Sequence, residues 1–350
     1  MKANVRPPSL GSIGAEEELW RQRVGALEAV PRLLRERGID PTPALASAGV
    51  HESAFALADN TIPYGAFGRL LHGAAQLSGV DHFGLLLGPA WELRHLGLLG
   101  QLVRHAATVR DALHYGAVYH HLNSQGGVVF VHDHGGVAEL GYAIYFRGIV
   151  GARQIYDGVL AAQAQFMREL CGPGWVPSEV LLAHAAPADP SPYVSLFRCP
   201  VRFGSELNAL RFPSAWLDRA VTGADAAEWR RLQALANAQS QPELIDKVRR
   251  SLRVQLLNRV SSGDAVADML AMHRRTLNRR LEALGTTFKD VLEEVRFEAA
   301  RQLLESTDLS LDDIASALGY AGDSPFARAF RRRSGMTPGQ WRRQVNGPPT

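Results

Sequence analysis

Two arginine-rich segments near the carboxyl end of the chain constrain its fold most strongly. Each segment has a short stretch of small and apolar residues, a break, and then a stretch dense in arginine, and the two copies span 266–285 and 310–335. A short helix, a tight turn and a basic second helix form the helix-turn-helix motif, whose second helix can enter the major groove of DNA. Two copies in tandem are far more specific than one basic amphipathic helix, and they predict a DNA-binding domain.

In the first copy, the predicted buried face carries Leu277, Leu281 and Leu284, which lie four and three residues apart. Arginine can bind guanine, and asparagine can bind adenine, through two hydrogen bonds. The candidate DNA contacts are therefore the polar residues outside this face: Arg274, Arg275, Thr276, Asn278 and Arg279.

In the second copy, Phe326 and Phe330 form the predicted buried ridge. Ser324 followed by Pro325 is typical of an N-cap and a first helical position, which would set the amino terminus of the helix near a phosphate or a base edge. Ser310, with Asp313 three residues later, predicts a capping-box start for the supporting helix. The candidate DNA contacts in this copy are Asp323, Ser324, Pro325, Arg328, Arg331 and Arg332.

The segment between the two copies, residues 288–306, predicts one continuous helix. It contains no glycine or proline, and it places four apolar residues on one stripe: Leu292, Val295, Ala299 and Leu303. A rigid connector of this kind would fix the distance between two recognition helices.

This arrangement resembles the AraC/XylS family of transcription regulators over roughly residues 242–343. The resemblance implies that Arg275, Asn278 and Arg279 contact bases in the first copy and that residues 323–325 and Arg328 do so in the second. One departure is His273, where the family usually has a serine cap. The other matching residues are Thr276, Leu277, Arg280, Leu281, Gly285, Phe288, Arg296, Ala300, Ile314, Ala315, Leu318, Gly319, Tyr320, Phe326, Ala329, Phe330, Gly335, Pro338 and Arg342.

Length and charge both indicate two domains. A chain of 350 residues exceeds the usual size of one hydrophobic core. Residues 242–350 contain 18 Lys and Arg against 14 Asp and Glu, so the net charge of +3 for the whole chain leaves −1 for residues 1–241. The positive excess thus lies on the predicted DNA-binding segment, and most of it is arginine, which suits bidentate contacts to phosphate and guanine.

We expect three parts: a flexible tail at 1–14, a ligand-sensing and dimerisation domain at 15–241, and the tandem helix-turn-helix domain at 242–350, which is all-α. Hydrophobic periodicity predicts an α+β sensor with a helical half up to residue 122 and then a small antiparallel sheet. A β-hairpin turn is predicted at 133–136, a helix at 153–170 and a linker at 239–242.

Within this half, residues 199–218 resemble the arabinose-binding-domain-like sensor of one AraC/XylS subgroup. The resemblance implies a small-molecule inducer and a homodimer. The helical pattern differs from the mostly β, cupin-like sensor of the arabinose regulator, so it does not imply sugar binding.

These observations favour a cytoplasmic regulator that binds double-stranded DNA. The family resemblance implies that it responds to an inducer, acts as an activator and contacts RNA polymerase. The chain begins without the apolar core of a signal peptide, and it has no apolar run long enough to span a membrane. Cys171 and Cys199 suit a reducing compartment, either as incidental thiols or as a redox-sensing pair. A repressor without a ligand and a non-specific architectural DNA binder remain alternatives.

Histidines support a rival hypothesis, a metal-dependent cupin-like enzyme domain fused to the DNA-binding module. His132, His134 and Glu139, with His120 and His121 before them, have a spacing close to that of cupin metal ligands. Phe146 occupies the place of the motif's final glycine, however, and His134 falls in the predicted turn, whereas two ligands on one strand must occupy alternate positions within it. We therefore favour surface histidines and expect no metal, no cofactor and no catalytic residues.

Several aromatic residues are candidates for a ligand pocket, although ordinary core packing is the favoured interpretation for each. They are Tyr64, Trp91, Tyr115, Tyr119 and Trp175.

Overall fold

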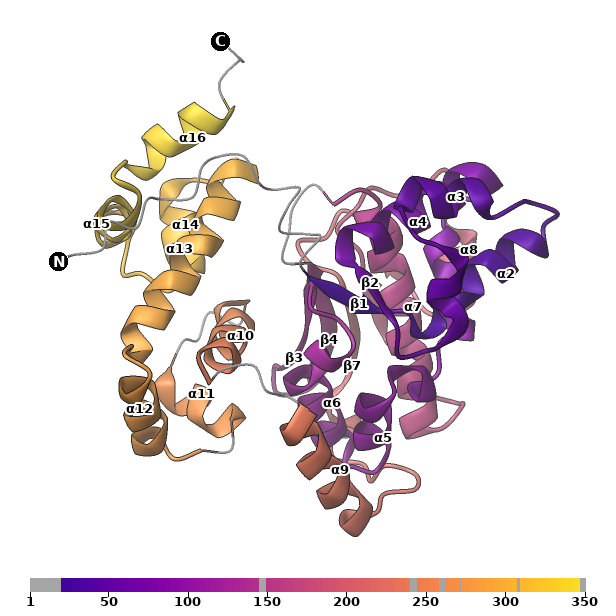
Figure 1. Ribbon diagram of the computed structural model, residues 1–350, viewed down its shortest axis with the longest axis horizontal. Helices are drawn as coiled ribbons and strands as arrows, with labels where there is room; N and C mark the ends of the chain where they lie inside the picture. The colour runs from indigo at the N-terminus through magenta and orange to yellow at the C-terminus, as the bar shows by residue number, and fades with distance from the viewer. Residues whose placement is uncertain are drawn as a thin grey trace. The chain divides into compact units, whose positions relative to one another are not determined.

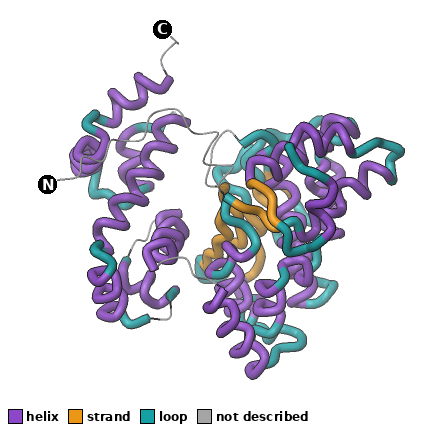
Figure 2. Tube along the Cα trace, in the orientation of Figure 1, coloured by secondary structure: helices purple, strands orange, loops and turns teal. Residues whose placement is uncertain are grey.

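The computed structural model describes residues 20–144, 149–239, 244–257, 262–270, 272–306 and 309–346. The chain divides into two compact units, Met1–Ala236 and Asn237–Thr350 (Figure 1). Strands occur in the first unit, whereas the described part of the second unit is entirely helical (Figure 2). The predicted tail at 1–14 and most of the predicted linker lie outside the described residues.

The amino-terminal half of the first unit is mainly helical, as predicted. Helix ends follow the local sequence: Pro41 is the N-cap of α3, and Gly79, in a left-handed conformation with φ 65°, ends α4. A two-stranded sheet of β1 and β2 was not predicted, because strands of three residues are too short to show a periodicity. The elements are β1 (Arg21–Arg23), η1 (Gly25–Glu28), α2 (Ala29–Arg35), α3 (Thr42–Ala48), η2 (Glu52–Ala56), β2 (Thr61–Pro63), α4 (Tyr64–Ser78), η3 (Phe83–Ala90), η4 (Leu93–Leu96), α5 (Leu98–Arg104), α6 (Val109–Val118) and η5 (His120–Leu122).

A five-stranded sheet follows, with the strand order β3-β4-β7-β5-β6. The predicted hairpin is confirmed, since β3 and β4 are antiparallel and the chain reverses between Asp133 and Val137. The prediction of a wholly antiparallel sheet is wrong at one edge, because β5 and β6 are parallel. A parallel pair needs a crossover connection, which here contains the helix α8. The bounds are β3 (Gly127–Asp133), β4 (Val137–Ile144), β5 (Glu179–Leu181), α8 (Ser191–Phe197), β6 (Val201–Arg202) and β7 (Ala209–Pro213).

The helix α7 (Ala152–Cys171) contributes to two hydrophobic cores of the first unit. Leu160 and Met167 join the core that includes the sheet, and Ile155 joins the core of the amino-terminal helices. A side chain at Gly84 of η3 would collide with the backbone of Gln154, so glycine allows η3 to approach α7 closely. The last helix of the unit, α9 (Ala226–Gln239), packs onto the first of these cores.

The second unit contains two helix-turn-helix pairs connected by the predicted continuous helix. Each pair has its own hydrophobic core, and α13 contributes Val291 and Val295 to one core and Ala300 and Leu304 to the other. The predicted stripe of α13 is only half-buried at Leu292, Ala299 and Leu303, because the helix serves two cores and needs two buried faces. The elements are α10 (Leu244–Leu257), α11 (Gly263–Met269), α12 (Arg274–Ala283), α13 (Phe288–Ser306), α14 (Leu311–Ala317), α15 (Asp323–Ser334) and α16 (Pro338–Asn346).

None of the helices within the described residues has the length and apolar character needed to cross a membrane.

Candidate nucleic-acid interface and ligand pocket

The first candidate recognition helix is α12. His273 is its N-cap, and Nδ1 of this histidine accepts a hydrogen bond from the backbone N–H of Arg275 at 3.3 Å. The imidazole thus takes the place of the serine hydroxyl expected at this position. Leu277 and Leu281 are fully buried, but the prediction that Leu284 shares their face is wrong, because Leu284 is the C-cap and is 49% exposed.

The outer side of α12 presents two arginines four residues apart. Arg275 and Arg279 are both exposed, and they lie opposite the two buried leucines of the helix. Thr276 and Asn278 flank them and are half-buried. This side of α12 can therefore offer two guanidinium groups and one amide to a groove edge.

The start of α15 differs by two residues from the sequence prediction. Gly322 is the N-cap, with φ 145°, and the helix begins at Asp323 without a side-chain cap. The prediction of Ser324 as N-cap is therefore wrong: its hydroxyl donates instead to the Oδ1 atom of Asp323 at 3.3 Å. Pro325 is the third helical residue, where proline fits because no intrahelical partner exists for its backbone nitrogen.

The two faces of α15 separate apolar from basic residues. Phe326 and Phe330 are 1% and 2% exposed, which confirms the predicted ridge. Arg328 and Arg331 are exposed and lie on the opposite side, together with Ser324 near the amino terminus of the helix. The second helix thus offers the same kind of surface as the first. The supporting helix α14 also starts as predicted, with the hydroxyl of Ser310 capping its first turn.

Two of the predicted DNA contacts already have partners inside the unit. The guanidinium of Arg274 lies over the ring of Phe288, 4.5 Å from its centroid. Arg332 donates from Nη2 to Oε2 of Glu293 in α13 at 3.2 Å, although its side chain is 68% exposed. These contacts connect the two recognition helices to α13, and DNA contact by Arg274 and Arg332 stays a prediction.

Ion pairs and hydrogen bonds hold α13 against its neighbours on both sides. Arg249 of α10 donates to both carboxylate oxygens of Glu294 at 2.9 and 3.0 Å. Arg296 donates to the carbonyl oxygen of Gly319 at 3.0 Å and lies 4.7 Å from the ring centroid of Tyr320. Arg296 therefore fixes α13 to the end of α14, which gives a structural reason for one of the residues that carried the family resemblance.

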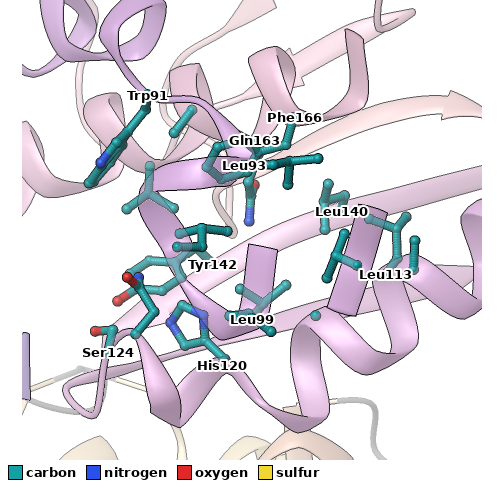
Figure 3. Close-up of a pocket in the computed structure, with 18 of the residues that line it drawn as sticks. Trp91, Leu93, Leu99, Leu113, His120, Ser124, Leu140, Tyr142, Gln163 and Phe166 are labelled. Carbon is teal, nitrogen blue, oxygen red and sulfur yellow. The ribbon is translucent and has the colours of Figure 1, made fainter. Parts of the chain in front are cut away.

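The first unit contains a cavity of about 90 Å³ between η4, α5, α6, η5, the β3–β4 hairpin and α7. Most of its lining is apolar. Figure 3 shows His120, Ser124 and Tyr142 toward one side of the cavity and Leu113 and Leu140 toward the other. Of the five aromatic candidates from the sequence, Trp91 lines this cavity. Tyr115 instead packs against Trp229, with the two ring centroids 4.8 Å apart.

Three polar atoms in the cavity wall are buried and have no hydrogen-bond partner in the described structure: Nε2 of His120, Oγ of Ser124 and Oε1 of Gln163. Such atoms are rare in folded proteins, because leaving a buried polar atom unpaired costs stability. Burial lowers the pKa of His120 to about 4, so its imidazole is neutral near pH 7. The sequence analysis missed Ser124 and Gln163 and considered His120 only in connection with a metal.

The β3–β4 hairpin brings His132, His134 and Glu139 together, with one possible ligand atom of each lying within 4.8 Å of the others. Arg211 is a competing partner for the carboxylate, since it donates from Nε to Oε1 of Glu139 at 2.8 Å. Burial alone would raise the pKa of Glu139, but the hydrogen bonds and charges of Arg211 and His134 together outweigh it and lower the pKa. This carboxylate is thus neutralised by a guanidinium, and His134 lies in the turn beyond β3, so the cluster does not form the strand-borne ligand set of a cupin.

Comparisons with known proteins place both units in one family. The family described as "Arabinose-binding domain of AraC transcription regulator, N-term" matches residues 38–221, and the family "Helix-turn-helix domain" matches residues 266–344. The "HTH-type transcriptional regulator VirS" of Mycobacterium tuberculosis is 30% identical over 338 residues, covering 95% of this chain and 97% of that protein. The chain belongs to the AraC/XylS family of DNA-binding transcriptional regulators.

Two further comparisons cover most of the length of this AraC/XylS regulator. The "Ornithine utilization regulator" of Pseudomonas aeruginosa is 27% identical over 330 residues, covering 91% of this chain and 95% of that protein. The crystal structure of the transcriptional regulator CdpR from Pseudomonas aeruginosa is 23% identical, with a TM-score of 0.43, and covers 89% of this chain and 98% of that one. The ornithine utilization regulator is named as a regulator, like VirS.

The two cysteines of the regulator are free thiols, Cys171 half-buried and Cys199 buried. Burial raises the pKa of each thiol to about 11. Thiolates are the reactive form of cysteine, so both side chains are unreactive near neutral pH.

Proposed function

We propose that this AraC/XylS regulator recognises a bipartite DNA site, with α12 and α15 entering two consecutive segments of the major groove. Arg275, Asn278 and Arg279 would contact bases in one half-site, and Arg328 would do so in the other, with Thr276, Ser324 and Arg331 at groove edges or phosphates. The observation that carries this proposal is that both basic faces belong to helices packed on one continuous helix, α13.

The length of α13 suits two adjacent half-sites. Its 19 residues span roughly 28 Å at about 1.5 Å per residue. Consecutive major-groove segments on one face of DNA are about 34 Å apart, or about 10 base pairs. The remaining arginines and the amino terminus of α15, near Asp323 and Pro325, would set the register through the phosphates.

We further propose that a small molecule in the cavity of the first unit controls DNA binding and that the regulator acts as an activator. A cavity whose wall contains unpaired polar atoms supports a ligand-binding role for this unit. Family membership supports a homodimer and a contact with RNA polymerase. Analytical ultracentrifugation tests the first of these, and transcription from a target promoter with purified polymerase tests the second and the sign of regulation.

Selection of binding sites from random double-stranded DNA by the full-length protein tests the DNA proposal. We expect enrichment of one site with two conserved halves about 10 base pairs apart. A double variant, Arg279→Ala with Arg328→Ala, should lose this enrichment, whereas Arg230→Ala, a control at an exposed arginine of α9, should retain it. Enrichment of a single short half-site, or none by a folded protein, would contradict the proposal.

A further inference from the structure

The wall of the cavity in the first unit restricts the charge of any ligand. Among the described residues that line it there is no aspartate, glutamate, lysine or arginine. Its one titratable imidazole, His120, is neutral near pH 7. A carboxylate, phosphate or ammonium group buried here would have no partner of opposite charge, which is strongly unfavourable. The ligand that suits this wall is uncharged.

The unpaired atoms of the wall define which hydrogen-bond donors and acceptors the ligand must have. Nε2 of Gln163 donates to the carbonyl oxygen of Gly141 at 3.3 Å, so this bond orients the amide and leaves Oε1 as an acceptor that requires a donor. The hydroxyl of Ser124 can donate or accept, and Nε2 of His120 can do either according to its tautomer. Ser124 and Gln163 are 2% and 5% exposed, so solvent at the surface does not satisfy them. The complementary group is one that both donates and accepts.

The position of these atoms separates a polar end from an apolar body. His120 and Ser124 lie toward one side in Figure 3, Leu113 and Leu140 line the opposite side, and the amide of Gln163 points into the space between the two sides. Trp91 and Phe166 add aromatic surface to the wall. The volume of about 90 Å³ limits the ligand to a small molecule, with a body no larger than about one ring.

We propose that the cavity binds a small uncharged molecule with one aromatic ring, or an apolar group of similar size, and a single polar end that both donates and accepts hydrogen bonds, as an alcohol, a phenol or a primary amide does. His120, Ser124 and Gln163 bind the polar end, and the leucines and aromatic residues surround the body. This inference rests on the proposed ligand-responsive function and adds the class of ligand to it.

Four probes that share one ring and differ in their polar end test the inference: benzyl alcohol, toluene, benzoate and benzylammonium. Each is titrated into the full-length protein, and binding is followed by NMR of labelled leucine methyl groups. Signals of Leu113 and Leu140 report on the cavity, and those of Leu34, in the other core of the unit, serve as a control. We expect benzyl alcohol to bind about tenfold more tightly than toluene, the ratio expected for one additional net hydrogen bond, and the charged probes to bind most weakly.

A variant pair assigns the polar end. Ser124→Ala removes only the hydroxyl and should reduce the advantage of benzyl alcohol over toluene from about tenfold to about threefold, because His120 and Gln163 still bind the polar end, without changing the affinity for toluene. Ser78→Ala in α4 removes a hydroxyl that bonds to the carbonyl oxygen of Ala74, outside the cavity, and should leave both affinities unchanged. The affinities of the four probes for the unaltered protein test the inference even if a variant does not fold.

Three results would overturn the inference. They are binding of benzoate or benzylammonium as tight as that of benzyl alcohol, no change at Leu113 and Leu140 with any probe, and an unchanged alcohol advantage in folded Ser124→Ala. DNA binding by the same preparation separates this inference from the proposed function. A protein that binds its selected DNA site but ignores all four probes has a different class of ligand. A protein that binds benzyl alcohol but selects no DNA site retains the ligand class and loses the proposed DNA recognition.

Discussion

Acidification should lower the free energy of unfolding of the first unit through protonation of His120. The substitution His120→Leu should remove this part of the pH dependence. Burial lowers the pKa of His120 to about 4, from the ordinary histidine value of 6.5. The folded chain therefore keeps this imidazole neutral at pH values where the unfolded chain already binds a proton. Its contribution to the free energy of unfolding is complete above about pH 6.5 and is lost as the pH falls toward about 4.

The size of this effect follows from the two pKa values. One pKa unit corresponds to about 1.4 kcal/mol, so the difference between 6.5 and about 4 sets an upper limit of about 3 kcal/mol. At about pH 5 most of the unfolded chains carry the proton and few folded chains do, which gives an expected loss of about 2 kcal/mol. This is a large part of the net stability of an ordinary domain.

The assay is urea unfolding of the full-length protein and of His120→Leu at about pH 7.5 and about pH 5, followed by tryptophan fluorescence. The signal reports chiefly on the first unit, because five of the six tryptophans precede residue 237. Burial also lowers the pKa values of His114 and His132, but these residues are present in both proteins. The difference between the two proteins thus isolates His120. An equal loss of stability in both on acidification would refute the reasoning.

Three further predictions concern the DNA-binding helices and the hairpin. Arg279→Ala and Arg328→Ala should each weaken binding to the selected site by about 1–3 kcal/mol and relax the preference at one base pair in competition assays; an equal loss on all sequences would indicate phosphate contacts. His273→Ala should cost about 1 kcal/mol of stability in thermal unfolding, whereas His273→Ser should retain most of it, and equal losses would exclude the capping role. Glu139→Gln should destabilise the hairpin at neutral pH, because it removes one of the two carboxylates that pair with Arg211, the other being Glu179; the deficit should shrink as the pH falls below 4.5, the ordinary pKa of a glutamate, and the native carboxylate is protonated, and a deficit independent of pH would contradict this.

Elements whose signal lies within a few residues could be predicted from the sequence. The hairpin turn before Val137, the Ser310 cap and the ridge of Phe326 and Phe330 each depend on neighbours along the chain, and the structure confirms them. The start of α15 was misplaced because a Ser-Pro pair is compatible with the first turn of a helix as well as with its cap.

Features that depend on contacts between distant segments could not be predicted. His120, Ser124 and Gln163 come from different elements and meet only in the folded unit, and no spacing pattern connects them. For the same reason, the partners of Arg274 and Arg332 in α13 could not be predicted, because an arginine with an internal partner and one without are identical in a helical pattern.

Under the proposed mode of DNA binding, the shared helix α13 makes two properties of the target site independent of each other: its base sequence and the spacing of its half-sites. Substitutions at Arg279 or Arg328 alter exposed groups and leave both hydrophobic cores intact. A single residue inserted in α13 would rotate one core by about 100° relative to the other. During evolution, the base sequence that such a regulator prefers can therefore diverge one position at a time, while the separation of its half-sites resists change.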